Sequence, residues 1–205
     1  MIIISAENLS MRFGLRGVFK DISFRLASPS SLTVTGPNGS GKSTLLKIIA
    51  GLLVPTSGRV RMESDSDEIK AESRRKLMAM VSPEMNFYDE LTGAENLEFF
   101  MKASGSRLKP EEIEEALNEV GLQGRGDDYL KAYSSGMRMR LKYALAILKQ
   151  PEIMIVDEPS TNLDASGRKI IYDLMHRHQQ NGILIFATNE DDEIAIANER
   201  INLAR

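Results

Sequence analysis

Two kinds of hydrophobic pattern alternate along the chain. Short β-like runs predict strands, and the uninterrupted apolar runs at residues 153–156 and 183–187 predict buried strands. These runs are residues 2–4, 22–26, 32–34, 59–62, 77–81, 153–156, 183–187 and 201–203. Residues 42–50 and 167–178 carry apolar positions at helical spacing, and Gly51 ends the first of these helices. The polar stretch 65–75 predicts a connection. Strands alternating with helices predict an α/β core.

The middle of the chain has only helical patterns. Thr92 and Glu95 have capping-box spacing ahead of an apolar run. Pro110 opens a second helix, which carries glutamates in its first turn and ends at Gly121. A third helix begins near Ser135, and its predicted apolar face consists of Met137, Leu141, Ala144, Leu145 and Leu148. We therefore expect a helical insertion within the α/β core.

Composition narrows the classes of function. The 205 residues are 42% hydrophobic and 27% charged, which is typical of one folded domain. A net charge of −3 provides no overall positive field, so nucleic acid is not an expected partner. The absence of cysteine excludes disulfides and cysteine-ligated metal sites, and it fits a reducing cytoplasm. No apolar run approaches the ~20 residues that span a bilayer, and the N-terminus does not read as a signal peptide. Any membrane role is therefore expected to come through a partner.

Residues 36–43, Gly-Pro-Asn-Gly-Ser-Gly-Lys-Ser, match the phosphate-binding pattern G-x-x-x-x-G-K-[ST]. Glycines allow backbone N–H groups to turn toward phosphate oxygens, and the following helix adds its positive N-terminal end. Lys42 would place a charge at the β- and γ-phosphates, and the Ser43 hydroxyl would bind Mg²⁺. The strand–loop–helix context favours this over a glycine-rich turn with a surface lysine. The candidate nucleotide-binding residues here are Gly36, Pro37, Asn38, Gly39, Ser40, Gly41, Lys42, Ser43 and Thr44.

A second motif supports the same chemistry. The apolar run 153–156 leads directly into Asp157 and Glu158. A strand that ends in an acid is how P-loop ATPases hold Mg²⁺ beside the phosphates, which predicts a metal-binding role for Asp157 through water. Glu158 is then placed to polarise the attacking water as a general base. The alternative is a pair of solvated carboxylates at a strand end, which the neighbouring phosphate loop disfavours.

Between these motifs, residues 133–137 read Tyr-Ser-Ser-Gly-Met and resemble the signature segment of ATP-binding-cassette (ABC) nucleotide-binding domains. Residues 159–164, Pro-Ser-Thr-Asn-Leu-Asp, resemble the D-loop of that family. The resemblance covers nearly the whole chain. It implies an α/β fold with a P-loop NTPase core (a mixed sheet flanked by helices), an α-helical subdomain insertion and a small N-terminal antiparallel β region. The expected core is residues 1–85 and 151–205, and the expected signature subdomain is residues 86–150, within one domain.

The resemblance also implies a mechanism. Two such domains pair head to tail with ATP between them, and Ser134, Ser135 and Gly136 of one copy face the phosphate loop of the other. Phe13 stands where the family stacks an aromatic on adenine; the alternative is a packed strand residue. The implied partners are a second ABC ATPase subunit, in a homo- or heterodimer, and an integral membrane transporter subunit. The implied location is cytoplasmic, at the inner face of the membrane through that partner.

Four positions depart from the family pattern. Glu84 replaces the usual Q-loop glutamine; its carboxylate can still bind Mg²⁺ but adds negative charge beside a triphosphate. Asn189 replaces the usual switch histidine; it can donate a hydrogen bond to the γ-phosphate but cannot carry a proton. In the signature, Ser135 replaces a glycine, and Met137 replaces the glutamine and lacks its amide. Because Lys42, Asp157 and Glu158 remain, we expect an ATPase, with slow hydrolysis as a consequence of the replacements.

Two further features bear on partners. An aromatic and apolar group around the Q-loop is predicted either to receive the membrane partner or to form the core of the insertion; it comprises Phe87, Tyr88, Leu91, Phe99, Phe100 and Met101. The overall pattern looks closest to ATPases of ABC-2-type exporters and of haem export. Alternative functions are a nucleotide-gated regulatory subunit with little hydrolysis, a soluble ABC protein acting on DNA or ribosomes, and a small-molecule P-loop kinase. None of these patterns identifies the cargo or the direction of transport.

Overall fold

The computed structural model describes residues 1–65 and 67–203 and confirms the α/β class. The chain forms two compact units. The first comprises Met1–Met80, Pro151–Pro159 and the chain from His176 onward, and the second comprises Val81–Gln150 and Ser160–Met175. The predicted insertion at residues 86–150 lies within the second unit. Among the described residues, no helix combines the length and the apolar character that crossing a bilayer requires.

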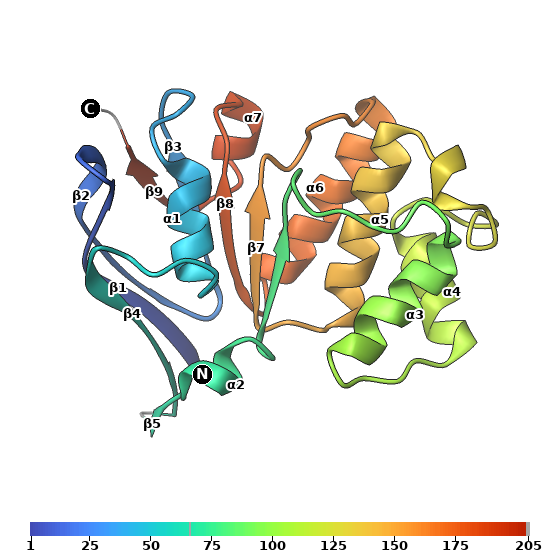
Figure 1. Cartoon of the computed structure of the whole chain (residues 1–205), viewed down its shortest axis with the longest axis horizontal. Coiled ribbons are helices and arrows are strands. Elements are labelled where there is room, and N and C mark those ends of the chain that lie inside the picture. The colour runs from blue at the N-terminus through green and yellow to red at the C-terminus, as the bar shows by residue number, and fades with distance from the viewer. Residues whose placement is uncertain (66, 204–205) are drawn as a thin grey trace. The chain divides into compact units, whose positions relative to one another are not determined.

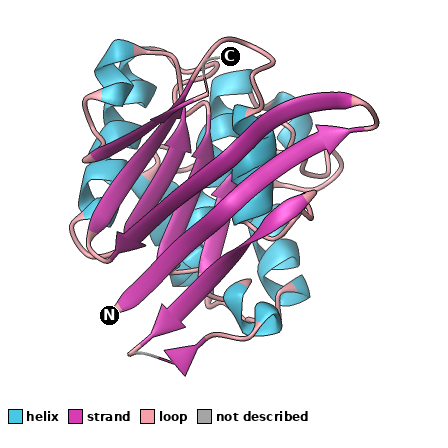
Figure 2. Ribbon diagram, turned by 90° about the vertical axis from the view of Figure 1, so that its left-hand side faces the viewer, coloured by secondary structure: helices cyan, strands magenta, loops and turns pink. Residues whose placement is uncertain are grey.

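An antiparallel sheet begins the first unit (Figure 2). Its strands are β1 (Ile2–Phe13), β2 (Arg16–Ala27), β4 (Ser57–Ser64) and β5 (Asp67–Glu68), in the order β2-β1-β4-β5. Strands β1 and β2 pair from Ile3–Ala27 to Phe13–Arg16, so only Gly14 and Leu15 form the turn. Gly14 has a φ of 58°, a conformation that glycine adopts without steric cost. The long hairpin therefore carries Phe13 at its tip.

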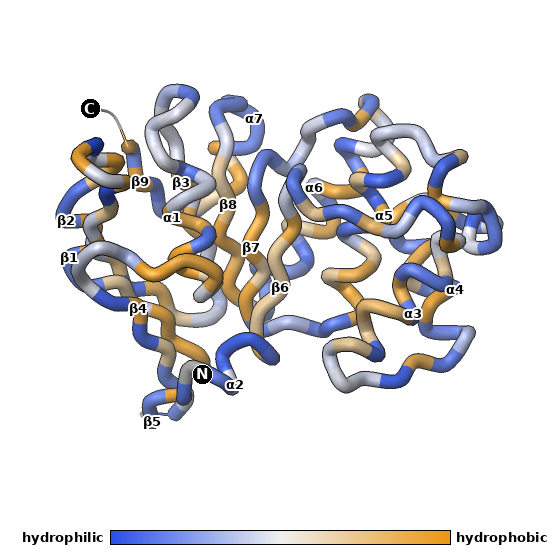
Figure 3. The backbone as a smooth tube through the Cα atoms, viewed as in Figure 1, coloured by the Kyte–Doolittle hydropathy of each residue, from blue (hydrophilic) through white to orange (hydrophobic). Residues whose placement is uncertain are grey.

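A five-stranded sheet forms the core of the same unit. Its order is β6-β7-β8-β3-β9, and β3 pairs in parallel with both β8 and β9, as β7 does with β8. The strands are β3 (Ser30–Thr35), β6 (Met78–Val81), β7 (Ile153–Asp157), β8 (Ile183–Ala187) and β9 (Glu199–Asn202). Every residue of β7 and β8 is buried, as the uninterrupted apolar runs predict, and both strands are largely orange in Figure 3. Helix α1 (Lys42–Ile49) packs against them.

Helices build the second unit (Figure 1). They are α3 (Gly93–Ala103), α4 (Pro110–Glu119), the 3₁₀ turn η1 (Leu130–Ala132), α5 (Ser135–Leu148) and most of α6 (Ala165–Gln179). The predicted capping box is confirmed, because Thr92 accepts a hydrogen bond from the Glu95 N–H while Glu95 accepts one from the Thr92 N–H. Helix α5 packs on both α3 and α4, which explains why it is buried beyond the single predicted face.

Some predicted boundaries were wrong. Strands β1 and β2 are far longer than the runs at residues 2–4 and 22–26, because polar residues interrupt the apolar alternation where the strands bulge. At these points Asn8 and Asp21 have positive φ, and the hydroxyls of Ser23 and Ser10 accept hydrogen bonds from their N–H groups. The stretch 65–75, predicted as a connection, contains β5 and the short helix α2 (Ala71–Arg74). A second short helix, α7 (Asp191–Ile194), precedes β9.

The buried parallel strands should dominate the stability of the fold. Ile185 lies at the centre of β8, between Leu32 of β3 and Ile155 of β7, and its side chain is fully buried. We expect Ile185→Ala to lower the free energy of unfolding by about 2–5 kcal/mol, because it leaves a cavity in the core. Chemical denaturation followed by circular dichroism measures this loss. Leu15→Ala, at a fully exposed side chain of the hairpin turn, is the control and should change stability little; equal losses in both variants would contradict the assignment.

Candidate nucleotide-binding site

The phosphate loop joins β3 to α1 and depends on glycines at defined points. Gly36, Gly39 and Gly41 have φ values of 144°, 77° and 103°, all in the region that favours glycine. Gly41 is the N-cap residue of α1. A Cβ atom there would collide with Val18 Cγ1 and lie 3.2 Å from Phe19 Cδ1. Strand β2 therefore backs the loop so closely that only glycine fits.

Two polar side chains of the loop are turned inward. Lys42 is 8% exposed, and its Nζ donates hydrogen bonds to the carbonyl oxygens of Gly36 at 2.7 Å and Pro37 at 3.4 Å. Ser40 Oγ is buried and finds no hydrogen-bond partner in the described part of the chain. A buried hydroxyl without a partner costs free energy, which a phosphate oxygen could offset. The lysine and the serine thus fit an anion.

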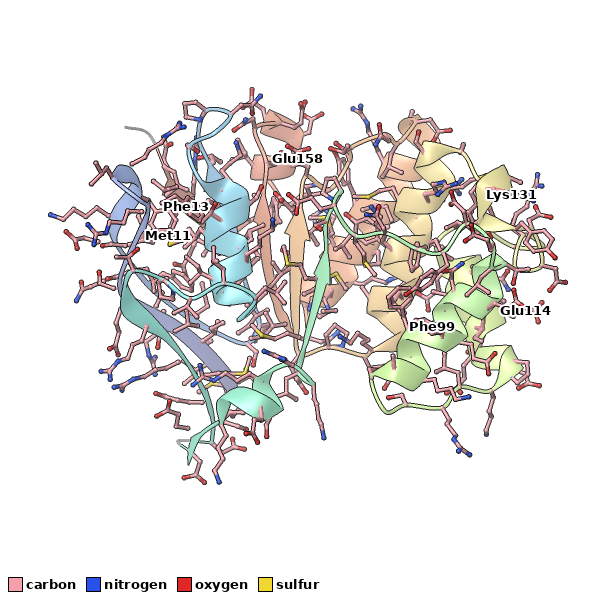
Figure 4. All side chains as sticks on the ribbon, viewed as in Figure 1. Met11, Phe13, Phe99, Glu114, Lys131 and Glu158 are labelled. Atoms are coloured by element: carbon pink, nitrogen blue, oxygen red, sulfur yellow. The ribbon has the colours of Figure 1, made fainter. Side chains whose placement is uncertain are left out.

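A hollow of about 480 Å³ opens beside the loop within the first unit. It is lined by Phe13, Arg16, Gly17, Val18, Asn38, Gly39, Gly41, Lys42, Ser43, Thr44 and Glu158. Phe13 and Glu158 are labelled in Figure 4. The Phe13 ring is 55% exposed, so the alternative of a packed strand residue is wrong. Most of the predicted loop residues, the aromatic and the acid therefore line one hollow.

Sequence reasoning missed Arg16 and Val18 as lining residues. Arg16 pairs with Phe13 across the hairpin, so both side chains lie at the tip of the same two strands. Only the register of the hairpin reveals this, and the sequence Gly14-Leu15 is not among the strongest hairpin-turn signals. Arg16 is the cation that β2 adds to the hollow, beside Lys42.

Strand β7 ends in the two predicted acids. Asp157 is its last residue and is 5% exposed, whereas Glu158 is exposed and lines the hollow. Glu158 has a φ of 53°, an uncommon conformation for a residue with a side chain. Its N–H donates to the Ala187 carbonyl at 3.0 Å, which ties the strained residue to the end of β8. Backbone strain that the surrounding structure enforces is frequent at functional sites, and here it supports a role for Glu158.

Asn189 lies two residues beyond β8 and contacts the phosphate loop directly. Its Oδ1 accepts a hydrogen bond from the Gly36 N–H at 3.3 Å, and its Nδ2 donates to Asn38 Oδ1 at 3.4 Å. The structure thus brings the residue at the predicted switch position against the loop. Its amide can exchange these contacts for a phosphate oxygen without gaining or losing a proton.

The oxygen-bearing side chains near the phosphate loop suit Mg²⁺ that is held partly by the phosphates of a nucleotide, rather than a metal ion held by protein side chains alone. Among residues 1–65 and 67–203, no group of three or more His, Cys, Asp or Glu side chains is arranged to hold a metal ion. Mg²⁺ is commonly held by one or two carboxylates together with substrate phosphates. Ser43 and Asp157 offer a hydroxyl and a carboxylate of this kind in the first unit. The third predicted ligand, Glu84, is exposed and belongs to the second unit.

The signature segment forms the N-terminus of α5 in the second unit. Ser134 is the N-cap, and its Oγ accepts a hydrogen bond from the Met137 N–H at 3.2 Å. Ser134 and Ser135 are exposed. A Cβ on Gly136 would lie 2.9 Å from the carbonyl oxygen of Asn162, so the signature glycine permits close approach of the D-loop. The result is an exposed helix end with two hydroxyls.

The flanking residues of these motifs are fixed by hydrogen bonds. Tyr133 Oη donates to the Arg125 carbonyl at 2.6 Å, and burial, with the nearby Asp128 charge, raises the pKa of this phenol to about 12. Asp164 Oδ1 accepts from the Gly167 N–H at 2.7 Å and from Ser166 Oγ at 2.9 Å. These bonds hold the pKa of Asp164 below its usual value. The signature and the D-loop therefore rest on ordered turns.

An aromatic cluster follows the Q-loop; it consists of Phe87, Tyr88, Phe99 and Phe100. The Phe87 and Phe100 rings meet edge to face with centroids 5.4 Å apart, and Tyr88 and Phe99 meet at 5.1 Å. Tyr88 is 49% exposed and Phe99 is 46% exposed. Of the larger predicted apolar group, Met101 is buried, whereas Leu91, Phe87 and Phe100 are half-buried. The cluster is therefore a partly exposed surface rather than a closed core.

Similar proteins are plentiful. The profile of the family described as ABC transporter matches residues 19–161. The ABC transporter ATP-binding protein YdbJ of Bacillus subtilis is 34% identical over 189 residues, which are 91% of this chain but 61% of YdbJ. The cytochrome c biogenesis ATP-binding export protein CcmA of Haemophilus influenzae is 30% identical over 201 residues, 98% of this chain and 95% of CcmA. The chain thus spans about three fifths of YdbJ and nearly all of CcmA.

A solved structure has the same fold. The ATP-binding cassette MJ0796, in a dimeric post-hydrolysis state bound to ADP and Pi, superposes with a TM-score of 0.84 at 21% sequence identity. The match covers 97% of this chain and 93% of MJ0796.

The close packing around Gly41 predicts that one added methyl group at this position weakens nucleotide binding. We expect Gly41→Ala to weaken ATP binding at least tenfold, because the new Cβ collides with Val18 and the residue must keep a φ of 103°. Isothermal titration calorimetry with ATP measures the affinity. Gly17→Ala is the matched control, since Gly17 lines the same hollow and its added Cβ would meet no atom within 4 Å. Tight ATP binding by Gly41→Ala would show that the loop does not hold the phosphates.

Proposed function

Because this chain belongs to the ABC transporter family, we propose that it binds and hydrolyses MgATP as the ATPase subunit of a transporter. In this proposal it closes head to tail with a second ABC ATPase subunit and thereby moves an integral membrane subunit. The observation that carries the proposal is the single hollow that gathers Phe13, Lys42, Ser43 and Glu158. An aromatic platform, a phosphate loop and an acid in one hollow are the parts that ATP hydrolysis requires.

The nucleotide would extend along the hollow from the hairpin tip to the end of β7. The exposed ring of Phe13 offers a face on which adenine stacks. The backbone N–H groups of Gly36 and of residues 38–44, together with the positive end of α1, surround the phosphates. Lys42 then exchanges its two carbonyl contacts for phosphate oxygens, and Ser40 Oγ gains the hydrogen bond that it lacks. Binding is thus an exchange of polar contacts already oriented inward.

Hydrolysis would depend on groups at the ends of β7 and β8. Glu158 accepts a proton from the attacking water, and its strained backbone holds the carboxylate in the hollow. Asn189 donates its amide N–H to a γ-phosphate oxygen. Ser43 and Asp157 are the proposed holders of Mg²⁺, which would neutralise charge on the phosphates when bound, and the metal-binding role of Glu84 stays a prediction. A neutral Asn189 in place of a histidine is the reason to expect slow turnover.

The second ATPase subunit would complete the site. Ser134, Ser135 and Gly136 present hydroxyls and N–H groups at the start of α5, where an anion is stabilised by the helix. In the proposed pair these groups bind the γ-phosphate held by the other copy. MJ0796, whose fold this chain shares, is dimeric in a post-hydrolysis state with ADP and Pi, which supports such a pair. Loss of the γ-phosphate removes charge-assisted contacts and lets the pair open.

The aromatic cluster is the proposed docking surface for the membrane partner. Two of its rings are about half exposed, and exposed aromatic groups are typical of protein interfaces. The location proposed for the chain is cytoplasmic, against the inner face of the membrane through this contact. CcmA, which matches nearly the whole chain, is named as an ATP-binding export protein, so an exporter is the favoured class of transporter.

A glutamine at position 158 should separate binding from hydrolysis. We expect Glu158→Gln to lower steady-state phosphate release about 100-fold or more, because the amide cannot accept the proton from water. ATP affinity should remain, and MgATP-dependent dimers should accumulate on size-exclusion chromatography. Glu152→Gln, at an exposed acid before β7, is the matched control.

Equal phosphate release by wild type and Glu158→Gln would remove Glu158 from this role. MgATP-driven dimers of the wild type without turnover, even beside the membrane partner, would instead favour the regulatory subunit with little hydrolysis.

A charge in the aromatic cluster should abolish docking without unfolding the chain. We expect Phe99→Glu to reduce co-purification of the membrane partner from solubilised membranes about tenfold or more, because a charge would be buried at the contact. Tyr129→Glu, at another half-exposed aromatic outside the cluster, is the control. Thermal melting confirms that both variants fold; unchanged co-purification by folded Phe99→Glu would place the docking surface elsewhere.

A further inference from the structure

Three cationic side chains of α5 each bind a different feature of the second unit. Arg140 Nη1 donates to the carbonyl oxygens of Val120 at 3.2 Å and Gly121 at 2.6 Å, at the end of α4. Lys142 and Arg138 instead bind the two ends of the segment 82–89, which contains Glu84 of the Q-loop and two rings of the aromatic cluster. The helix that begins with the signature is therefore attached to the Q-loop by side chains.

Lys142 is the buried attachment. Its Nζ donates to the carbonyl oxygens of Ser82 at 3.0 Å and Pro83 at 2.8 Å, and the residue is 8% exposed. Burial lowers the pKa of the ammonium, since removing a charge from water is costly. Carbonyl oxygens compensate that cost only while the backbone that carries them stays in place. The geometry therefore penalises any movement of residues 82 and 83 away from α5.

The second attachment lies one helical turn earlier. Arg138 Nη1 forms an ion pair with Asp89 Oδ1 at 2.6 Å, and its Nε donates to the Tyr133 carbonyl at 3.5 Å. Positions 138 and 142 are four residues apart, so they lie on the same face of α5. The segment between Ser82 and Asp89 is thus fixed at its beginning and at its end to one helix face.

Packing between these two attachments is incomplete. A hollow of about 200 Å³ separates residues of the segment, among them Met85, from Ser135 and Lys142 of α5 and Asn162 of the D-loop. The Met85 N–H donates to Ser82 O at 3.2 Å, the same carbonyl that Lys142 binds. Side-chain contacts alone do not fill the space, so polar contacts position the segment. Lys142 binds its beginning, while the Arg138 ion pair and two hydrogen bonds between Asn96 of α3 and the Tyr88 backbone hold its end.

We propose that Lys142 is a positioning residue that, together with the Arg138–Asp89 ion pair, makes the segment 82–89 and the signature end of α5 move as one piece. When a docked partner displaces Phe87 or Tyr88, Glu84 and Ser135 then move together. The mechanical attachment stands on the contacts alone, whereas its consequence for transport rests on the proposed function.

Amide hydrogen exchange in the nucleotide-free chain tests the attachment. We expect Lys142→Met to raise exchange at the Met85 amide and its neighbours at least about tenfold, because two charge-assisted hydrogen bonds are lost. Lys142→Arg keeps a buried donor and should restore most of the protection. Arg140→Met is the matched control, since it removes a cation that binds two carbonyls from the same helix but at the end of α4.

Unchanged exchange at residues 84–88 in folded Lys142→Met would overturn the proposal, as would an equal increase in Arg140→Met, which would indicate general loosening. If Lys142→Met does not fold, Asp89→Asn decides the question at the exposed attachment. It should raise exchange in the same segment, and normal protection there would overturn the proposal.

A second measurement tests the coupling itself. In the wild type, MgATP should increase protection at residues 84–88 and 134–137 together. In Lys142→Met we expect protection at 134–137 to persist while that at 84–88 is lost, and joint protection in this variant would overturn the coupling. An absence of any MgATP response would contradict the proposed function, while the nucleotide-free measurement would still decide the attachment.

Discussion

Parallel pairing of β3, β7 and β8 is the constraint on which the site depends. Parallel strands bring their carboxyl ends to one edge of the sheet, where open α/β sheets bind ligands. β3 leads into Gly36 of the phosphate loop, β7 into Glu158, and β8 into Asn189. Gly36 and Asn189, which are 153 positions apart in the sequence, thereby meet at that edge and share a hydrogen bond.

The same sheet stabilises backbone conformations that residues rarely adopt. Glu158 and Gly41 both have positive φ, and Gly41 must also accommodate Val18 at close range. Strained residues persist only where neighbouring structure over-determines them. Fully buried β7 and β8, with α1 packed against them, supply that rigidity. The buried core strands stabilise the fold, and this stability offsets the backbone strain of Glu158 at the end of β7.

Local patterns predicted the parts of the fold that local sequence determines. The uninterrupted run at residues 183–187 is β8, and the glycine loop between a strand and a helix lies where the motif requires. Long-range pairing escaped prediction. The hairpin extends past bulges that break the apolar alternation, and Arg16 joins the hollow only through its register with Phe13. Lys142 occupies a buried position on α5 because distant carbonyls accept its hydrogen bonds, which no local pattern encodes. The roles of the site residues therefore remain predictions, although their placement beside the phosphate loop is observed for Phe13, Glu158 and Asn189.

Asn189 has a consequence for the conditions under which the chain can work. Histidine is the side chain whose unperturbed titration falls near neutrality, and this chain has two histidines, His176 and His178, in the last turn of α6. Neither lines the hollow beside the phosphate loop. An amide at position 189 makes the same hydrogen bonds in acidified and in neutral surroundings. The contacts of Asn189 with Gly36 and Asn38 therefore stay constant over the pH range in which a histidine at this position would gain a proton.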